Sequence, residues 1–188
     1  MTERRRQILL AAWDIAAESG LGAVTLHEVA RRVGIRQPSL YAHVPSKAGL
    51  YDAMFAHAYG ELLAEIDRLP PRGTAREQLV RLSRTILDYA VASPPRQQLL
   101  FQRTIPGFEP SAESYALAQR LIDRCVSLLS ALGAGSPAHV DVYTAVVAGL
   151  GAQQIANEPG GDRWTRHLEP LLDLFLTGFH PVGEDRAD

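Results

Sequence analysis

The sequence predicts an all-α protein of about nine helices. Over long stretches apolar residues recur three and four positions apart, which is the spacing of one buried helix face. Strict alternation of apolar and polar residues, the pattern of a half-buried strand, is missing. Clusters of Gly and Pro separate the helical stretches, and 188 residues with 46% hydrophobic content suffice for one large or two small domains.

The N-terminal region begins with a predicted helix from about Glu3 to Ser19, which Gly20 ends. A second helix is expected over residues 26–33, because Thr25 and Glu28 have the spacing of a capping box. Its buried face comprises Leu26, Val29, Ala30 and Val33. Gly34 then supplies the left-handed residue that commonly follows a helix.

Another short helix is predicted after a single turn. Pro38 is tolerated in the first turn of a helix, so this helix should begin near Arg36 or Gln37. Two short helices around a Gly-containing turn form a helix-turn-helix, whose second helix enters the major groove of DNA. Arg36 and Gln37 carry groups that read base edges. Pro45-Ser46-Lys47 should begin the next helix, where backbone amides and the chain's only lysine favour a phosphate.

The segment from Arg5 to about Leu62 resembles the DNA-binding domain of the TetR family of bacterial transcriptional regulators. The resemblance rests on Gln37-Pro38-Ser39-Leu40-Tyr41-x-His43-Val44-x-x-Lys47. It implies a three-helix DNA-binding domain over residues 1–47, with the motif at about 25–44 and a connecting helix at about 46–68. A helical regulatory and dimerisation domain would follow over 69–188. The implied function is a homodimeric repressor that a small molecule releases from its operator.

The resemblance also assigns roles to single residues. The expected phosphate contacts are Thr25, Tyr41, His43 and Lys47. The residues expected to face the bases are His27, Arg36, Gln37, Pro38 and Ser39. Arg36 departs from the family pattern, which often has a small hydroxyl residue or a carboxylate there. The operator sequence therefore does not follow from the resemblance.

Charge is distributed unevenly along the chain. The net charge is −2, yet residues 1–50 carry seven basic and four acidic residues, and the other 138 carry twelve and seventeen. A basic end on an otherwise acidic protein is typical of a DNA-contacting domain. A solvated basic helix face is the alternative. Because the basic end coincides with the helix-turn-helix, we expect double-stranded DNA with a near-palindromic operator as the partner.

The region from residue 69 onwards has no equally sharp motif. Its predicted helices are separated by breaks, of which Pro70-Pro71-Arg72-Gly73 and Glu158-Pro159-Gly160-Gly161 are the clearest. The resemblance implies a cavity for an unidentified small-molecule effector between these helices. Ordinary packing is the alternative for every candidate lining residue. The candidates are Tyr89, Phe101, Tyr115, Gln119, Tyr143 and Gln153.

The last two helices are predicted over 136–157 and 162–178. On the first of these helices, small residues spaced four positions apart would allow another helix to approach closely. The second helix carries large apolar side chains. Packing within one chain explains this spacing equally well, but the resemblance implies a four-helix bundle between two subunits. A homodimer would place two recognition helices ~34–36 Å apart, on two half-sites. The predicted interface residues are Ala145, Ala148, Gly149, Ala152, Leu168, Leu172 and Phe175.

Patterns for catalysis and metal binding are incomplete. His27-Glu28-Val29-Ala30-Arg31 lacks the second histidine of a zinc-protease motif, and Gly149-Leu150-Gly151 lacks the third glycine of a dinucleotide site. We therefore expect no catalytic, metal or cofactor site and no enzyme. The alternative is a helical small-molecule-binding protein or enzyme with an incidental basic end. A single cysteine and the lack of ~18 consecutive apolar residues predict a cytoplasmic protein without membrane contact.

Overall fold

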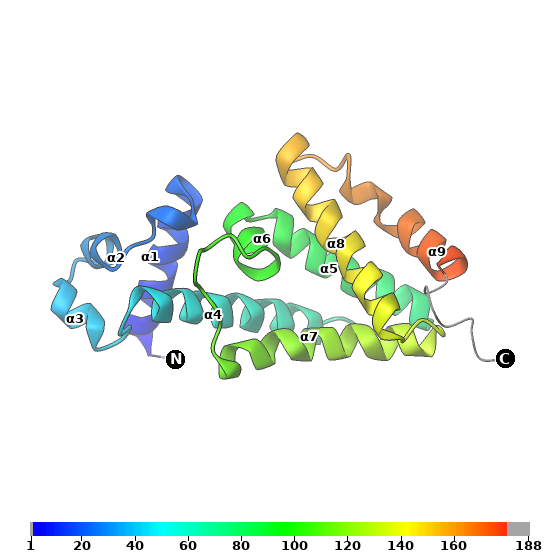
Figure 1. The fold of residues 1–188 in the computed structure, drawn as a ribbon, viewed down its shortest axis with the longest axis horizontal. Coiled ribbons are helices and arrows are strands. Elements are labelled where there is room, and N and C mark those ends of the chain that lie inside the picture. Colours follow the sequence, from blue (N-terminus) through cyan, green and yellow to red (C-terminus); the bar gives the residue numbers. More distant parts are fainter. Residues whose placement is uncertain (1, 180–188) are drawn as a thin grey trace. The chain divides into compact units, whose positions relative to one another are not determined.

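The computed structural model of the chain describes residues 2–179, which form helices and no strands (Figure 1). The prediction of an all-α fold is confirmed. None of the helices in this range is long and apolar enough to cross a membrane. The elements in order are α1 (Glu3–Ser19), the 3₁₀ turn η1 (Leu21–Ala23), α2 (Leu26–Val33), α3 (Gln37–Tyr41), α4 (Lys47–Asp67), α5 (Ala75–Val91), α6 (Pro94–Phe101), α7 (Ala112–Ala131), α8 (Pro137–Asn157), the 3₁₀ turn η2 (Thr165–His167) and α9 (Leu168–Gly178).

Local sequence signals set the ends of the first helices. Gly34 follows α2 with φ of 73°, in the left-handed region that favours glycine. At the start of α2, the Thr25 hydroxyl accepts a hydrogen bond from the Glu28 amide at 3.1 Å. The predicted capping box is only half formed, because the Glu28 carboxylate pairs with Arg31 instead of returning to the Thr25 amide. A complete capping box occurs at the start of α5.

The last helix begins later than the sequence suggests. The predicted start was residue 162, but α9 begins at Leu168. The reason is the buried side chain of Gln154 on α8, whose oxygen accepts hydrogen bonds from the amides of Trp164 at 2.8 Å and Thr165 at 3.3 Å. These bonds hold the preceding residues in a turn.

The chain divides into two compact units. The first unit comprises Met1–Leu63 and Ser93–Gln119, and the second comprises Ala64–Ala92 and Arg120–Asp188. The predicted boundary at residue 69 differs, because α6 and the segment after it pack with the N-terminal helices. In this unit the Tyr59 hydroxyl donates to the Leu100 carbonyl at 3.3 Å, and the Ser111 hydroxyl donates to Asp52 at 2.9 Å. Residues 180–188 of the predicted regulatory domain lie outside the described range.

The core of the second unit contains a small polar cluster. The hydroxyls of Tyr143 and Ser83 lie 2.8 Å apart, and the Cys125 thiol donates to the Tyr143 oxygen at 3.7 Å. Burial raises the pKa of Cys125 to about 11, so the thiol stays protonated near neutral pH. Cys125 is therefore a packing residue, as its apolar sequence neighbours predict.

Three of the predicted dimer contacts are buried inside the second unit. Leu168, Leu172 and Phe175 are at most 5% exposed, because this face of α9 packs on the protein's own helices. They are therefore corrected to core residues. On α8, by contrast, Ala145 and Gly149 are exposed, and Ala148 and Ala152 are half-buried.

Candidate nucleic-acid interface

The helices α2 and α3 form the predicted helix-turn-helix (Figure 1). The Ile35 amide donates to the Ala30 carbonyl at 3.0 Å, which closes the end of α2. Two residues later α3 begins at Gln37, with Pro38 in its first turn as predicted. Leu40 on α3 is fully buried and anchors the short helix to the domain. The opposite side of α3 is left at the surface.

The nine predicted DNA contacts lie at the surface or are half-buried. Thr25 and Gln37 are half-buried, and Tyr41 is 48% exposed although it is a large aromatic residue. Gln37 lies one helical turn before Tyr41, and its amide donates to the Tyr41 hydroxyl at 3.3 Å. The remaining exposed members are His27, Arg36, Pro38, Ser39, His43 and Lys47.

Ion pairs neutralise part of the positive charge in the N-terminal region. Arg6 pairs with Glu3 at 2.8 Å, Arg32 pairs with Glu18 at 2.6 Å, and Arg31 pairs with Glu28. In each pair, the hydrogen bond from the guanidinium lowers the pKa of the carboxyl group. Sequence spacing could reveal the pairs three residues apart. It could not reveal Arg32 with Glu18, which only the packing of α2 on α1 brings together.

Two cations of the motif are left without a carboxylate. Within the described residues, no ion pair involves Arg36 or Lys47. The Lys47 ammonium lies 5.6 Å from the centre of the Tyr51 ring, which is a cation–π contact. Arg36, just before α3, and Lys47, at the start of α4, therefore keep their charge for an external anion.

The start of α4 departs from the prediction in one respect. The Ser46 hydroxyl accepts a hydrogen bond from the Gly49 amide at 3.0 Å and so caps the helix. The Gly49 amide is thus already bonded and does not await a phosphate.

Tyr51 on α4 supports the helix-turn-helix from behind, and sequence reasoning missed it. It is 3% exposed, and its hydroxyl donates to the Leu21 carbonyl of η1 at 2.7 Å. Its ring meets Phe108 with centroids 5.8 Å apart. Phe108 belongs to residues 102–111 between α6 and α7, which we call the strap. Hydrogen bonds from Ser111 tie the end of the strap to Asp52 on α4.

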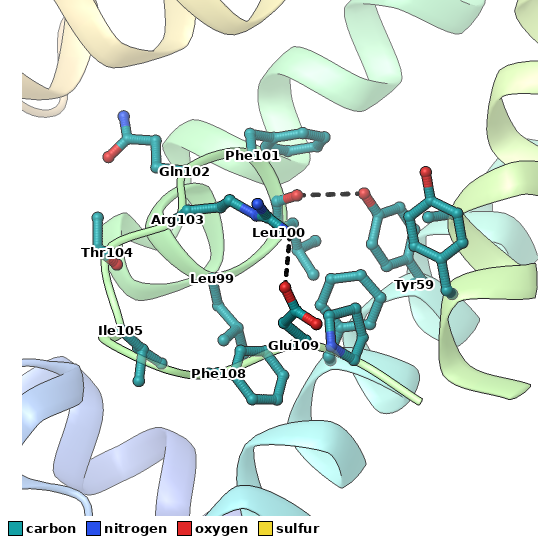
Figure 2. A pocket seen from close by; sticks show the side chains of 14 residues that line it. Tyr59, Leu99, Leu100, Phe101, Gln102, Arg103, Thr104, Ile105, Phe108 and Glu109 are labelled. Atoms are coloured by element: carbon teal, nitrogen blue, oxygen red, sulfur yellow. Dashed lines mark hydrogen bonds and ion pairs between the residues drawn. The ribbon is translucent and has the colours of Figure 1, made fainter. Parts of the chain in front are cut away.

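A pocket of about 340 Å³ opens beneath the strap, inside the first unit (Figure 2). We call it the aromatic pocket, because five aromatic rings line it. Figure 2 shows Tyr59 on one side and Phe101 and Phe108 on the others, with Arg103 reaching toward Glu109. That ion pair measures 3.4 Å, and both side chains are largely exposed. The aromatic lining comprises Phe55, Tyr59, Phe101, Phe108 and Tyr115.

The predicted effector-lining residues separate in the structure. Phe101 and Tyr115 line the aromatic pocket, whereas Gln119 is exposed outside it. Tyr89 and Tyr143 are buried in the second unit, and Gln153 is exposed. Helical spacing shows which face of a helix is buried, but it does not show which helices share a cavity. The missed residues Tyr59 and Phe108 could have been found only from the course of the strap.

The described residues hold no cluster of three or more His, Cys, Asp or Glu side chains that could bind a metal ion. Two further pockets within the described residues measure about 370 and about 250 Å³; the first lies beside Lys47 and the second near Arg81 and Arg124. The arrangement therefore offers an exposed cationic face and an aromatic cavity.

Comparison with known proteins agrees with this geometry. The sequence profile of the bacterial regulatory proteins of the tetR family matches residues 8–54. The chain is 25% identical to the HTH-type transcriptional regulator Rv1816 of Mycobacterium tuberculosis, over 63% of this chain and 49% of that protein. It is 27% identical to the class A tetracycline repressor from transposon 1721 of Escherichia coli, over 96% of this chain and 82% of the repressor.

The chain spans about half the length of the first curated relatives it matches, 49% for Rv1816 and 46% for a nucleoid occlusion factor of Haemophilus influenzae. The fold is shared with solved structures. A tetR-family transcriptional regulator from Streptomyces coelicolor superposes with a TM-score of 0.69 at 22% identity, over 92% of this chain and 78% of that one. The match to the tetR family of bacterial regulatory proteins thus covers the helix-turn-helix and the helices around it, residues 8–54 of the 188.

Proposed function

We propose that this protein is a sequence-specific DNA-binding transcriptional regulator, acting as a homodimeric repressor that a small molecule releases from its operator. The observation that carries the proposal is the face formed by α3 and the start of α4. Arg36 and Lys47 have no carboxylate partner in the part of the chain that the structure describes, and the neighbouring side chains are exposed. No ion pair among the described residues uses these two charges, and a recognition helix uses such groups to bind DNA. The proposal assigns the protein no catalysed reaction.

The residues of this face divide into two roles. Arg36, Gln37, Pro38 and Ser39 lie on or directly before α3, and together with His27 on α2 we assign them to base edges. Bidentate arginine and glutamine contacts discriminate between bases by about 1–3 kcal/mol each. Phosphates, which position the protein without reading sequence, are assigned to Thr25, Tyr41, His43 and Lys47.

The aromatic pocket is the proposed effector site. Its rings and its volume of about 340 Å³ suit a flat apolar molecule. Phe108 lines the pocket and contacts Tyr51, whose hydroxyl bonds to Leu21 in the turn before α2. A ligand that moves the strap therefore acts on the support of the helix-turn-helix. The ligand can shift the equilibrium between the DNA-binding and the released conformation only by the difference in its binding free energy for the two, typically about 1–3 kcal/mol.

The proposed dimer contact uses the exposed side of α8 and α9. Ala145 and Gly149 leave room for a close helix approach, and Leu174 is 65% exposed on α9. Burial of this apolar side chain between two subunits would be favourable. A twofold dimer would present two copies of α3 to two half-sites of an operator.

The test is equilibrium binding of the full chain to DNA fragments flanking its own gene, measured over a range of salt. Lys47→Gln should weaken all fragments alike and reduce the salt slope by about one per protomer. Arg36→Ala should relax sequence preference and cost about 1–3 kcal/mol on the preferred fragment. Arg163→Gln, an exposed arginine of the second unit, is the matched control and should leave both quantities unchanged.

Two outcomes would contradict the proposal. Equal losses from all three substitutions would show non-specific electrostatics instead of separate base and phosphate contacts. Binding that selects no fragment at any salt would favour the alternative, a small-molecule-binding protein or enzyme with an incidental basic end.

A further inference from the structure

A second pocket of about 370 Å³ lies in the first unit, at the base of the helix-turn-helix. Residues from four separate segments line it: Leu21 and Gly22 of η1, Lys47, Ala48 and Tyr51 of α4, Gln98 of α6, and strap residues 104–108. We call it the lysine pocket. It shares Thr104, Ile105 and Phe108 with the aromatic pocket, so one strap forms a wall of both.

The lining of the lysine pocket has a particular chemistry. Its walls are largely apolar, and none of its lining residues is acidic. Its one charged member is Lys47, whose ammonium lies 5.6 Å from the centre of the Tyr51 ring, another wall residue. The aromatic pocket differs, because its only arginine, Arg103, is already paired with Glu109.

We propose that the lysine pocket binds an apolar organic anion, whose carboxylate pairs with the Lys47 ammonium while its body packs on Tyr51, Ile105 and Phe108. The charge of Lys47 calls for an anion, because no carboxylate of the described residues neutralises it. The apolar walls call for a hydrophobic body, since ligand pockets combine apolar lining with a few polar groups that orient the ligand. A flat aromatic acid meets both demands.

Such a ligand would act on DNA binding by a different route from an effector in the aromatic pocket. This consequence rests on the proposed function, in which Lys47 contacts a phosphate. When the Lys47 ammonium pairs with a carboxylate in the pocket, it is no longer available to a DNA phosphate. The ligand would therefore weaken binding to all DNA sequences alike, and it would lower the salt slope as removal of the lysine does.

The experiment compares two probes of equal shape, 2-naphthoate and the uncharged 2-naphthamide. Each is titrated by calorimetry against the full chain without DNA. Wild-type protein should bind the carboxylate about tenfold more tightly than the amide, the difference typical of a charged hydrogen bond. Lys47→Gln should abolish that preference and leave the affinity for 2-naphthamide unchanged. Arg68→Gln, which removes an exposed charge in the second unit, should retain the preference.

Three results would overturn the inference: no binding of either probe, a carboxylate preference that survives Lys47→Gln, or one that Arg103→Gln abolishes instead. The last would place the probe in the aromatic pocket. A DNA titration forms the second arm, in which 2-naphthoate should weaken binding by wild-type protein but not by the Lys47→Gln variant. If the chain selects no DNA while the calorimetric result holds, the proposed function fails and the pocket assignment stands.

Discussion

Tyr51→Phe tests the support of the helix-turn-helix, because it removes one hydroxyl and keeps the aromatic ring. That hydroxyl is buried and donates to the Leu21 carbonyl at 2.7 Å, with the Val24 carbonyl at 3.5 Å. Leu21 does not become an unbonded carbonyl in the variant, since its oxygen also accepts from the Val24 amide at 3.1 Å. The loss is therefore that of one net hydrogen bond, about 1 kcal/mol of unfolding free energy.

The assay is urea unfolding followed by circular dichroism, with amide hydrogen exchange at residues 21–24. We expect the midpoint to fall without a change in slope, and exchange in this turn to become faster. Tyr115→Phe is the matched control, because Tyr115 lies in the same unit, is 55% exposed, and its hydroxyl makes no hydrogen bond to any of residues 2–179. The reasoning is refuted if the two variants lose equal stability, or if Tyr51→Phe costs more than about 3 kcal/mol.

Three other predictions follow from the second unit. A Cβ at Gly149 on α8 meets no atom within 4 Å, and the same holds for Gly60 on α4, so the chain has room for a side chain at either position. In analytical ultracentrifugation, Gly149→Arg should therefore give a folded monomer, whereas Gly60→Arg should remain a dimer. If both variants assemble equally, α8 is not part of the dimer interface. Hydrogen bonds from Arg76 lower the pKa of Asp173, so its carboxylate stabilises the folded state at pH values above the ordinary pKa of Asp, and this stabilisation is lost as the pH falls. Burial raises the pKa of Asp88, so its ionised carboxylate destabilises the folded state at neutral pH. Urea unfolding at pH 7 and pH 3 should therefore show Asp173→Asn destabilising mainly at pH 7 and Asp88→Asn stabilising there, and a reversed order would contradict the assignment. Cys125 should react with a thiol reagent at pH 8 only after unfolding, and prompt native-state labelling would show that its burial is wrong.

The sequence predicted α1, α2 and α3 almost to the residue, because their ends depend on local chemistry. Thr25 bonds to an amide three residues away, Gly34 needs no side chain at positive φ, and Pro38 fits only the first turn of a helix. The start of α9 was missed because Gln154, on another helix, bonds the amides that precede it.

The surface and the cavities depended on contacts distant in sequence. The local charge marked the N-terminal end as basic, but only the packing of α2 on α1 shows that Arg32 pairs with Glu18. Arg36 and Lys47 take part in no ion pair within residues 2–179. Likewise the apolar spacing of α9 suited a dimer contact, yet the chain's own helices bury Leu168 and Leu172.

By itself the sequence determined the all-α fold and the helix-turn-helix, since caps, turns and helical periodicity act within a few residues. Only the tertiary structure decided which cations are neutralised, which aromatic residues share a pocket, and that Tyr51 joins the strap to Leu21. These features require elements distant in the sequence to meet, as Tyr51 and Phe108 do over 57 positions. Their meeting is fixed by how whole helices pack, which the pattern along any one helix does not contain.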